Sequence, residues 1–224
     1  MGTVTGAVVA TPLAIEHRAL GGPGDVRVPT AEVVTTGAGP RRSREAAATL
    51  GARPRLVAGV AGALGRGITP GDLVVADEVR GPEGRSVRLP SAPLLAAALR
   101  AAGLTVHVGP VVSAEHVVTG AERAALGRPS AAYQERSILT SGVSEGPSLT
   151  SRPALAVDTE SAWLVSGEVP SAVVRAVVDT PEHPLVRPGT LTRGIAALRA
   201  LRRAAPMIAA WCAALGEREV LLAE

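Results

Sequence analysis

The feature that most constrains the fold is a regular alternation of short β-type runs with helical patterns. Apolar or β-branched runs predict strands at residues 5–10, 33–36, 55–59, 72–79, 104–112, 154–157 and 171–178. Helical spacing predicts helices at residues 40–50, 90–99, 119–126 and 190–215, the last interrupted at Pro206. Strands joined by helices run parallel, so the order predicts an α/β fold whose largely parallel sheet is covered on both faces. In such sheets, ligands bind at the carboxyl ends of the strands.

Length and composition suit one domain that spans residues 1–224. Hydrophobic residues make up 46% of the chain, but it contains no Phe, so Ala, Val and Leu must fill the core. The net charge of +3 comes from scattered arginines, and two Trp and one Tyr offer little surface for stacking on bases. Nucleic-acid binding is therefore disfavoured.

The cysteine content and the hydropathy pattern indicate the cellular compartment of the protein. Cys212 is the single cysteine and cannot form an internal disulfide, and its apolar helical surroundings predict a buried, inert thiol. The apolar start of the chain, residues 1–15, lacks a basic region and is typical of a first strand rather than of a signal peptide. No uncharged apolar run is long enough to span a membrane. We therefore expect a cytoplasmic protein that does not cross a membrane.

Two carboxylates stand at the edges of apolar runs in the stretch from Ala154 to Pro184. Glu160 follows the run at 154–157, and Asp179 ends the run at 171–178. Acids in these positions often cap helices or form turns and salt bridges. They can also form a catalytic pair, since both would lie at one edge of the sheet. The pattern alone leaves both interpretations open.

Other segments offer weaker candidates. Glu16 follows the first predicted strand and can face the same edge. Gly37 and Gly39 precede a helix that starts at Pro40, and this helix start, together with Arg41 and Arg42, favours an anion such as phosphate. The segment lacks the third glycine of a dinucleotide-binding fingerprint.

Two further segments have open interpretations. Residues 59–65, a glycine-rich run, predict either a loop whose backbone approaches a flat ligand or a tight crossover. Residues 127–153, rich in Ser, Gly and Pro, predict a surface loop that is either a lid or an inert insertion. His183 with Glu182 matches no standard metal site, and the chain has no G-x-S-x-G nucleophile motif. No metal is predicted.

Three motifs in register resemble the nucleoside phosphorylase and nucleosidase superfamily over about residues 4–215. They are Val57-Ala-Gly-Val-Ala-Gly-Ala-Leu64 with Thr69-Pro-Gly-Asp-Leu-Val-Val-Ala76, Ala156-Val-Asp-Thr-Glu-Ser-Ala162, and Val174-Arg-Ala-Val-Val-Asp179. Three more segments, residues 36–42, 115–123 and 179–185, resemble the hopanoid-associated phosphorylases. That group is assigned to removing adenine from adenosylhopane to leave a ribosylhopane.

The resemblance implies a three-layer αβα sandwich with a mixed, largely parallel central sheet, and cleavage of the N-glycosidic bond of a nucleoside. It implies no cofactor, with inorganic phosphate as a possible co-substrate, and a homodimer. Asp179 would protonate or hydrogen-bond the purine N7, and Glu16 would position or deprotonate the attacking water. Glu160, with Thr159 beside it, would bind the ribose. The purine pocket would be lined by Ala61, Gly62, His116 and Val117.

The chain also departs from the family. Thr159 replaces a usual Met, and Val178 replaces a frequent Ser or Thr. Val57 and Val60 stand where bacterial purine phosphorylases carry the phosphate-binding Arg and Ser. These departures favour hydrolysis, or phosphorolysis through another anion site at Gly37, Gly39, Arg41 and Arg42.

We therefore expect an enzyme acting on an adenosine-type nucleoside with an apolar 5′ substituent. The alternatives within this class are a methylthioadenosine/adenosylhomocysteine nucleosidase and a futalosine hydrolase. The alternative from another class is a catalytically weak nucleoside-binding protein.

Overall fold

A computed structural model describes residues 6–21, 31–127, 152–181 and 190–223, with only the backbone described at 190 and 216–223. The strands are β1 (Val8–Thr11), β2 (Glu32–Thr35), β3 (Arg55–Ala63), β4 (Leu73–Arg80), β5 (Ser86–Arg88), β6 (Val106–Ser113), β7 (Ala156–Asp158) and β8 (Ser171–Asp179). The helices are α1 (Ala14–Gly21), α2 (Pro40–Leu50), the 3-10 turn η1 (Pro82–Gly84), α3 (Ala92–Ala101), α4 (Gly120–Leu126), α6 (Ser161–Leu164) and α7 (Thr190–Ala223).

The strands form one mixed sheet of eight strands. Its main path is β2-β1-β3-β7-β6-β4-β5, and β8 pairs with both β3 and β4. The pairs β1–β2, β1–β3, β3–β8, β4–β6 and β6–β7 are parallel. The pairs β3–β7, β4–β5 and β4–β8 are antiparallel. The predicted mixed, largely parallel sheet is confirmed.

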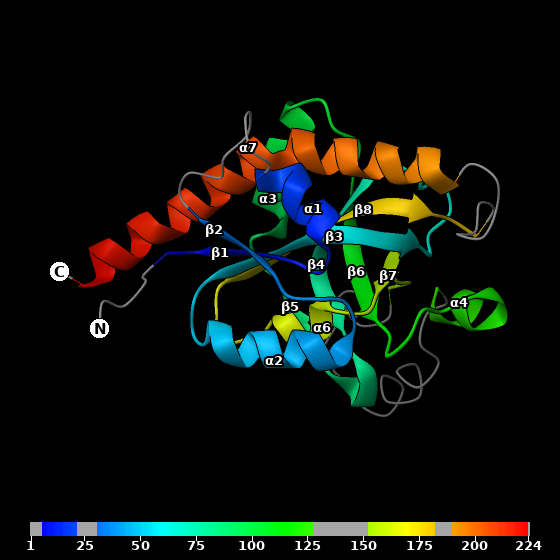
Figure 1. The fold of residues 1–224 in the computed structure, drawn as a ribbon, viewed down its shortest axis with the longest axis horizontal. Coiled ribbons are helices and arrows are strands. Elements are labelled where there is room, and N and C mark those ends of the chain that lie inside the picture. The colour runs from blue at the N-terminus through cyan, green and yellow to red at the C-terminus, as the bar shows by residue number, and fades with distance from the viewer. Residues whose placement is uncertain (1–5, 22–30, 128–151, 182–189, 224) are drawn as a thin grey trace, which may run out of the picture.

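Helices cover both faces of this sheet (Figure 1). Helices α1, α3 and α7 lie over one face, and α2 and α6 lie over the other. Two clusters of buried Ala, Val and Leu side chains fill the layers between the sheet and these helices. The predicted three-layer αβα sandwich is therefore also confirmed, with a core of small side chains.

The glycine-rich run at residues 59–65 was predicted as a loop or a crossover, and that prediction is wrong for most of its length. β3 continues to Ala63 and pairs with β8 through Gly62. The glycines are needed because long side chains cross the strand there. A Cβ on Gly59 would lie 2.6 Å from Arg175 Nη1, and a Cβ on Gly62 would lie 2.8 Å from Arg123 Nη2.

Helix α7 is continuous where an interruption was predicted. It runs through Pro206 and ends at Ala223. Proline removes one helical hydrogen bond at a cost of about 3 kcal/mol. Apolar side chains on both sides of Pro206, among them Leu201 and Ile208, are fully buried against the sheet. Their burial outweighs the lost bond, at about 1.5–3 kcal/mol for each large side chain.

Cys212 of α7 is the buried, inert thiol that the sequence predicts. It is 1% exposed and is not in a disulfide. Burial raises the pKa of this thiol to about 12, so it stays protonated at neutral pH. Across the described residues, no helix is both long and apolar enough to cross a membrane.

Candidate active site

A cavity of about 300 Å³ opens near the carboxyl ends of β1, β3, β7 and β8. Its lining includes every residue that was predicted to act in catalysis or to bind the ribose or the base. These residues are Glu16, Ala61, Gly62, His116, Val117, Thr159, Glu160 and Asp179. The chain brings them together from β3, β8, α1, the segment after β7 and the segment before α4. The volume is at the lower end of the range typical of small-ligand sites.

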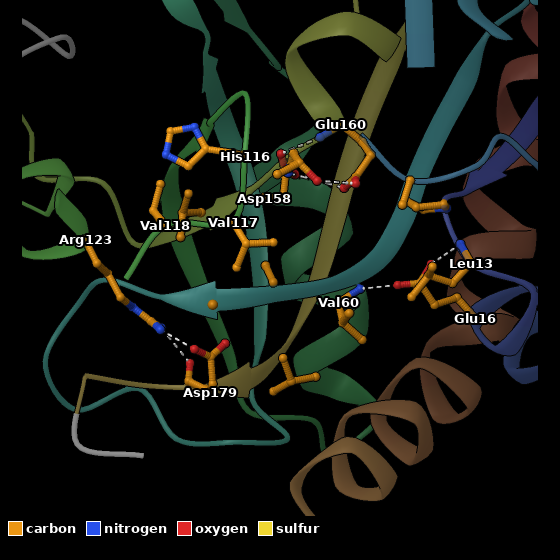
Figure 2. Close-up of a pocket in the computed structure, with 17 residues that line it drawn as sticks. Leu13, Glu16, Val60, His116, Val117, Val118, Arg123, Asp158, Glu160 and Asp179 are labelled. Atoms are coloured by element: carbon orange, nitrogen blue, oxygen red, sulfur yellow. Dashed lines mark hydrogen bonds and ion pairs between the residues drawn. The ribbon is translucent and has the colours of Figure 1, made fainter. Parts of the chain in front are cut away.

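The polar groups of the cavity are divided between two ends (Figure 2). Glu160 and Asp158 lie at one end, and Arg123 and Asp179 lie at the other. Glu16 of α1 also lines the cavity, and β3 runs between it and Glu160. Between the ends, the lining is mostly apolar and includes Val60, Val157 and Val178.

Asp158, not Glu160, caps helix α6. Asp158 Oδ1 accepts hydrogen bonds from the backbone amides of Glu160 and Ser161, both at 3.1 Å, and from Ser113 Oγ at 2.6 Å. Ser113 Oγ in turn accepts from the amide of Ala162 at 2.8 Å. The capping role considered for an acid after this strand thus belongs to Asp158, and the carboxylate of Glu160 is free to face the cavity.

Glu160 is held by donors from three parts of the chain. Its Oε1 accepts from the amide of Gly39 at 3.0 Å and from the hydroxyl of Thr159. Its Oε2 lies 3.5 Å from Arg175 Nη2. The side chain is therefore fixed in one orientation although it borders the cavity, which is what a hydrogen-bonding site for sugar hydroxyls requires.

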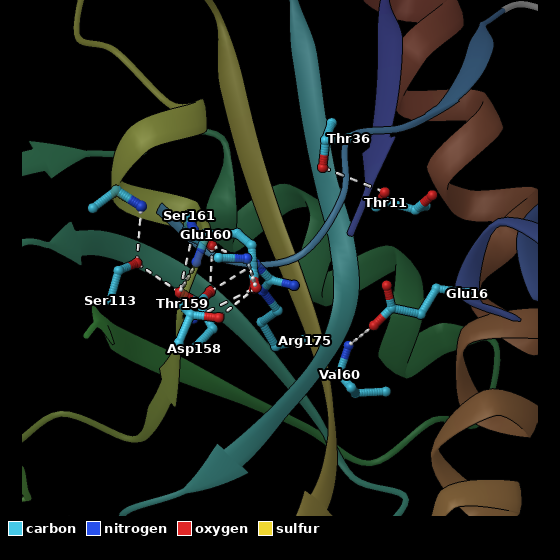
Figure 3. A network of polar contacts seen from close by, with 12 residues as sticks. Thr11, Glu16, Thr36, Val60, Ser113, Asp158, Thr159, Glu160, Ser161 and Arg175 are labelled. Atoms are coloured by element: carbon cyan, nitrogen blue, oxygen red, sulfur yellow. Dashed lines mark hydrogen bonds and ion pairs between the residues drawn. The ribbon is translucent and has the colours of Figure 1, made fainter. Parts of the chain in front are cut away.

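Arg175 of β8 is the positively charged residue that Asp158, Glu160 and Glu16 share (Figure 3). It is fully buried, and its Nη2 lies 2.7 Å from Asp158 Oδ2 and donates to Ser161 Oγ at 3.0 Å. Burial alone would lower the pKa of Arg175, but the charges of Asp158, Glu160 and Glu16 outweigh it and raise that pKa. One permanent positive charge thus faces three carboxyl groups, so this end of the cavity favours a cation.

Glu16 lies near the start of α1, a helix that the sequence did not predict. It is 1% exposed, and its two oxygens accept from the amides of Leu13 and Val60, both at 2.7 Å. Burial raises the pKa of Glu16 above its usual 4.5, against the opposing effects of Arg175 and of these two amides. A carboxyl group of raised pKa at a cavity wall suits proton transfer to or from a water.

The raised pKa of Glu16 predicts a pH-dependent stability. The folded protein binds this proton more tightly than the unfolded chain does. The contribution to stability is therefore complete below about pH 4.5 and is lost as the pH rises through the raised pKa. Glu16→Gln does not titrate, so its unfolding free energy should rise relative to the wild type as the pH increases from about 4.5 through the raised pKa. Urea unfolding across that range measures the difference, and a difference that is constant with pH would contradict the assignment.

The close approach at Gly59 gives a second prediction. A methyl group there would meet Arg175 Nη1 at 2.6 Å and Glu16 Oε1 at 2.8 Å. Gly59→Ala should therefore lower the unfolding free energy by about 1–3 kcal/mol through overpacking. Gly194→Ala in α7 is the matched control, because its added methyl group meets no atom within 4 Å, and it should be neutral or stabilising. Thermal unfolding compares the two, and equal melting temperatures would show that β3 can shift away from the network.

Asp179 at the other end is paired with Arg123 of α4. Arg123 Nη1 contacts Asp179 Oδ2, and Arg123 Nη2 donates to the backbone carbonyl of Asp179 at 3.0 Å. The arginine also donates to the carbonyl of Ala63 from Nε at 3.1 Å and from Nη2 at 2.6 Å. Both side chains of the pair are almost fully buried. Asp179 is therefore salt-bridged, as the more ordinary interpretation of the sequence expected, and it also lines the cavity.

The residues predicted to bind an anion do not line the cavity. Arg41 forms an ion pair with Glu45 at 2.9 Å on the surface. The side chain of Arg42 packs against Gly37, and the amide of Gly39 donates to Glu160 instead of facing an open site. Val57 is fully buried in the core. Only the neighbouring Ala38 contributes to the lining.

The two predicted base-binding residues before α4 lie at the mouth of the cavity. Val117 is 68% exposed, and His116 forms an exposed contact with Glu122 at 3.0 Å. The predicted Ser-rich loop at 127–153 lies outside the described residues apart from its two ends, and so do Glu182 and His183. Among the described residues, no group of three His, Cys, Asp or Glu side chains comes together as a metal site.

Sequence reasoning missed Asp158, Arg123 and Arg175 as site residues. Asp158 and Arg175 lie within the motifs that carry the resemblance, and a charged residue in the middle of an apolar strand such as β8 signals a buried partner. Arg123 ends the segment at 115–123 that resembles the hopanoid-associated phosphorylases, but as one of several arginines in polar helical surroundings it does not signal a buried partner. Only the contacts of its side chain with Ala63 and Asp179 show its role.

Comparison with known proteins supports the fold. No protein-family model and no curated sequence matches the chain. Among solved structures, the MTA/SAH nucleosidase of Streptococcus pneumoniae in complex with 8-aminoadenine is similar, with a TM-score of 0.62, 17% identity and coverage of 93% of this chain and 99% of that chain. A futalosine hydrolase mutant of Helicobacter pylori is similar with a TM-score of 0.62, 16% identity and coverage of 92% and 99%.

The nucleosidase of Neisseria meningitidis in complex with methylthio-immucillin-A is similar with a TM-score of 0.61, 18% identity and coverage of 92% and 97%. At these identities the likeness concerns the fold. The chain therefore has the fold of the nucleosidase members of the nucleoside phosphorylase and nucleosidase superfamily, over nearly its whole length.

Proposed function

We propose that this protein cleaves the N-glycosidic bond of an adenosine-type nucleoside and releases free adenine. One observation carries the proposal: buried carboxylates at both ends of one small cavity, on the fold of the MTA/SAH nucleosidases and futalosine hydrolases. Such cleavage needs negative charge near a cationic sugar and a polar group near the leaving base. Glu160 and Asp179 meet these two needs.

At the sugar end, Glu160 accepts hydrogen bonds from the ribose hydroxyls and favours the cationic sugar. The surplus of carboxyl groups around Arg175 supports this charge, since three acids face one arginine. The bond from C1′ to the base nitrogen breaks, and its electron pair leaves with the purine. A water oxygen then bonds to C1′, and Glu16 accepts the proton that this water loses. The purine anion takes up a proton from solvent water and leaves as neutral adenine.

We propose hydrolysis as the main reaction. Among the described residues that line the cavity, Arg123 carries the only permanent positive charge, and Asp179 already neutralises it. Val57 and Val60 supply no polar side chain for phosphate, and Arg41 and Arg42 point elsewhere. A phosphate dianion would thus meet carboxylates without a matching cation, which electrostatics disfavours.

The proposal includes an apolar 5′ substituent, of the kind found in adenosylhopane. Leu13 and Val117 line the cavity and are 40% and 68% exposed, so apolar side chains border its mouth. A methylthioadenosine, adenosylhomocysteine or futalosine substrate fits the same core chemistry. We also propose a homodimer, because Ile15 of α1, two residues after the cavity-lining Leu13, is 53% exposed. We propose a cytoplasmic location, because Cys212, the single cysteine, is buried and free.

The test is a substrate panel. We expect the purified protein to release adenine from at least one of adenosine, methylthioadenosine, adenosylhomocysteine and an apolar 5′-adenosyl conjugate. Chromatography of the free base measures the release, and Asp77→Asn, which breaks an ion pair with Arg152 outside the cavity, is the control variant. Binding of nucleosides without release of any base would instead identify a nucleoside-binding protein.

A further inference from the structure

Arg123 and Asp179 form a fixed pair at the end of the cavity opposite Glu160 (Figure 2). Arg123 is anchored to the sheet by two hydrogen bonds to the carbonyl of Ala63 and one to the carbonyl of Asp179. Gly62 of β3 passes so close that an added Cβ would lie 2.8 Å from Arg123 Nη2 and 2.9 Å from Asp179 Oδ1. The guanidinium and the carboxylate thus stand side by side against bare backbone.

Each member of the pair keeps one polar position without a partner among the described residues. Asp179 Oδ2 accepts from Arg123, but Oδ1 accepts no hydrogen bond there. Arg123 Nη1 carries two hydrogens and has only Asp179 Oδ2 as an acceptor. Because both residues line the cavity, the pair offers a ligand one N–H donor beside one carboxylate acceptor.

We propose that Arg123 binds the leaving purine directly. Its Nη1 donates to N7, and Asp179 Oδ1 accepts a hydrogen bond from the 6-amino group. This inference rests on the proposed function and names the base that the site selects. A 6-aminopurine presents an acceptor at N7 and a donor at the 6-amino group, which complements the pair. A 6-oxopurine presents two acceptors, so its O6 would face the carboxylate without a proton between them.

The same contact assists the reaction. When the C1′ bond breaks, its electron pair gives the purine negative charge. A guanidinium keeps its proton at any relevant pH, so it stabilises this charge by its own charge and a hydrogen bond and not by proton transfer. Asp179 then serves as the acceptor for the amino group and as the counter-ion that orients Arg123.

The test compares Arg123→Leu with the wild type on two substrates, an adenine nucleoside and its 7-methyl derivative. The methylated base already carries the positive charge that Arg123 would supply and cannot accept at N7. We expect Arg123→Leu to slow cleavage of the adenine nucleoside by about 10²-fold or more, and to leave cleavage of the 7-methyl nucleoside within about threefold or to raise it. Equal losses on both substrates would show a purely structural role and overturn the inference.

Two further variants keep the test independent of folding. Arg123→Lys retains the charge but cannot make the forked contacts, so it should recover part of the rate on the adenine nucleoside. Arg66→Leu removes an exposed arginine outside the cavity and should match the wild type on both substrates. Melting temperatures identify any variant that fails to fold.

Binding of free bases separates this inference from the proposed function. Calorimetry should show that the wild type binds adenine at least about tenfold more tightly than hypoxanthine, and that Arg123→Leu loses most of this preference. If no nucleoside is cleaved but this preference is present, the proposed function fails and the inference stands. If adenine is released but the wild type binds both bases equally, the inference fails alone.

Discussion

Asp179→Asn should lower the rate of base release by about 10²-fold or more and leave nucleoside binding within a few-fold. Asparagine has nearly the same shape as aspartate, so the wall of the cavity is kept. The neutral amide, however, cannot serve as the counter-ion that orients the guanidinium of Arg123 toward the leaving purine. The effect should therefore fall on the step in which the base leaves, and single-turnover kinetics with a separate measurement of the dissociation constant distinguishes that step from binding.

The control for this variant is Asp77→Asn, which removes an ion pair with Arg152 at 2.6 Å outside the cavity. It should leave base release unchanged. Unchanged release in Asp179→Asn as well would remove Asp179 from the reaction. It would leave this residue with the structural salt bridge that the sequence allowed as the ordinary interpretation.

The largest effect on stability is expected for Arg175→Met. This arginine is fully buried and faces the carboxyl groups of Asp158, Glu160 and Glu16. Its removal leaves buried negative charge without a counter-ion, which typically costs about 3–5 kcal/mol. Urea unfolding at neutral pH measures this loss.

Arg66→Met is the matched control for this measurement, because Arg66 is exposed and surface substitutions usually change stability by less than about 0.5 kcal/mol. If Arg175→Met were as stable as this control at neutral pH, the three carboxyl groups would not need Arg175 as a counter-ion. The surplus negative charge that we propose for the sugar end would then be absent.

The fold could be predicted from the sequence because its signals are local. The apolar run at β8 and the proline at the start of α2 indicate their elements from neighbouring residues alone. The structure has these elements within a few residues of the prediction. The errors arose where distant contacts decide. Residues 59–62 continue the strand because they pair with β8, and the glycines among them leave room for the side chains of Arg175 and Arg123. Helix α7 passes through Pro206 because apolar side chains in both of its halves are buried against the sheet.

The site was predictable in part for the same reason. The acids Glu16, Glu160 and Asp179 follow strand ends, where chain position alone places them at one edge of the sheet, and all three line the cavity. Their partners were harder to predict. Arg175 signals a buried partner but not which one, and Arg123 pairs with Asp179 across 56 residues of the chain. The anion site expected at Arg41 and Arg42 illustrates the limit. A helix start has the right local chemistry, but here Glu160 takes the amide of Gly39.

The central claim is that water attacks C1′ of an adenosine-type nucleoside in this cavity. The most direct measurement is a reaction in water labelled with ¹⁸O, with phosphate present, followed by mass spectrometry of the sugar product. Hydrolysis predicts one ¹⁸O atom in the sugar for each adenine released, and no ribose 1-phosphate. Adenine release with unlabelled ribose 1-phosphate as the sugar product, or no adenine release from any nucleoside of the panel, would contradict it.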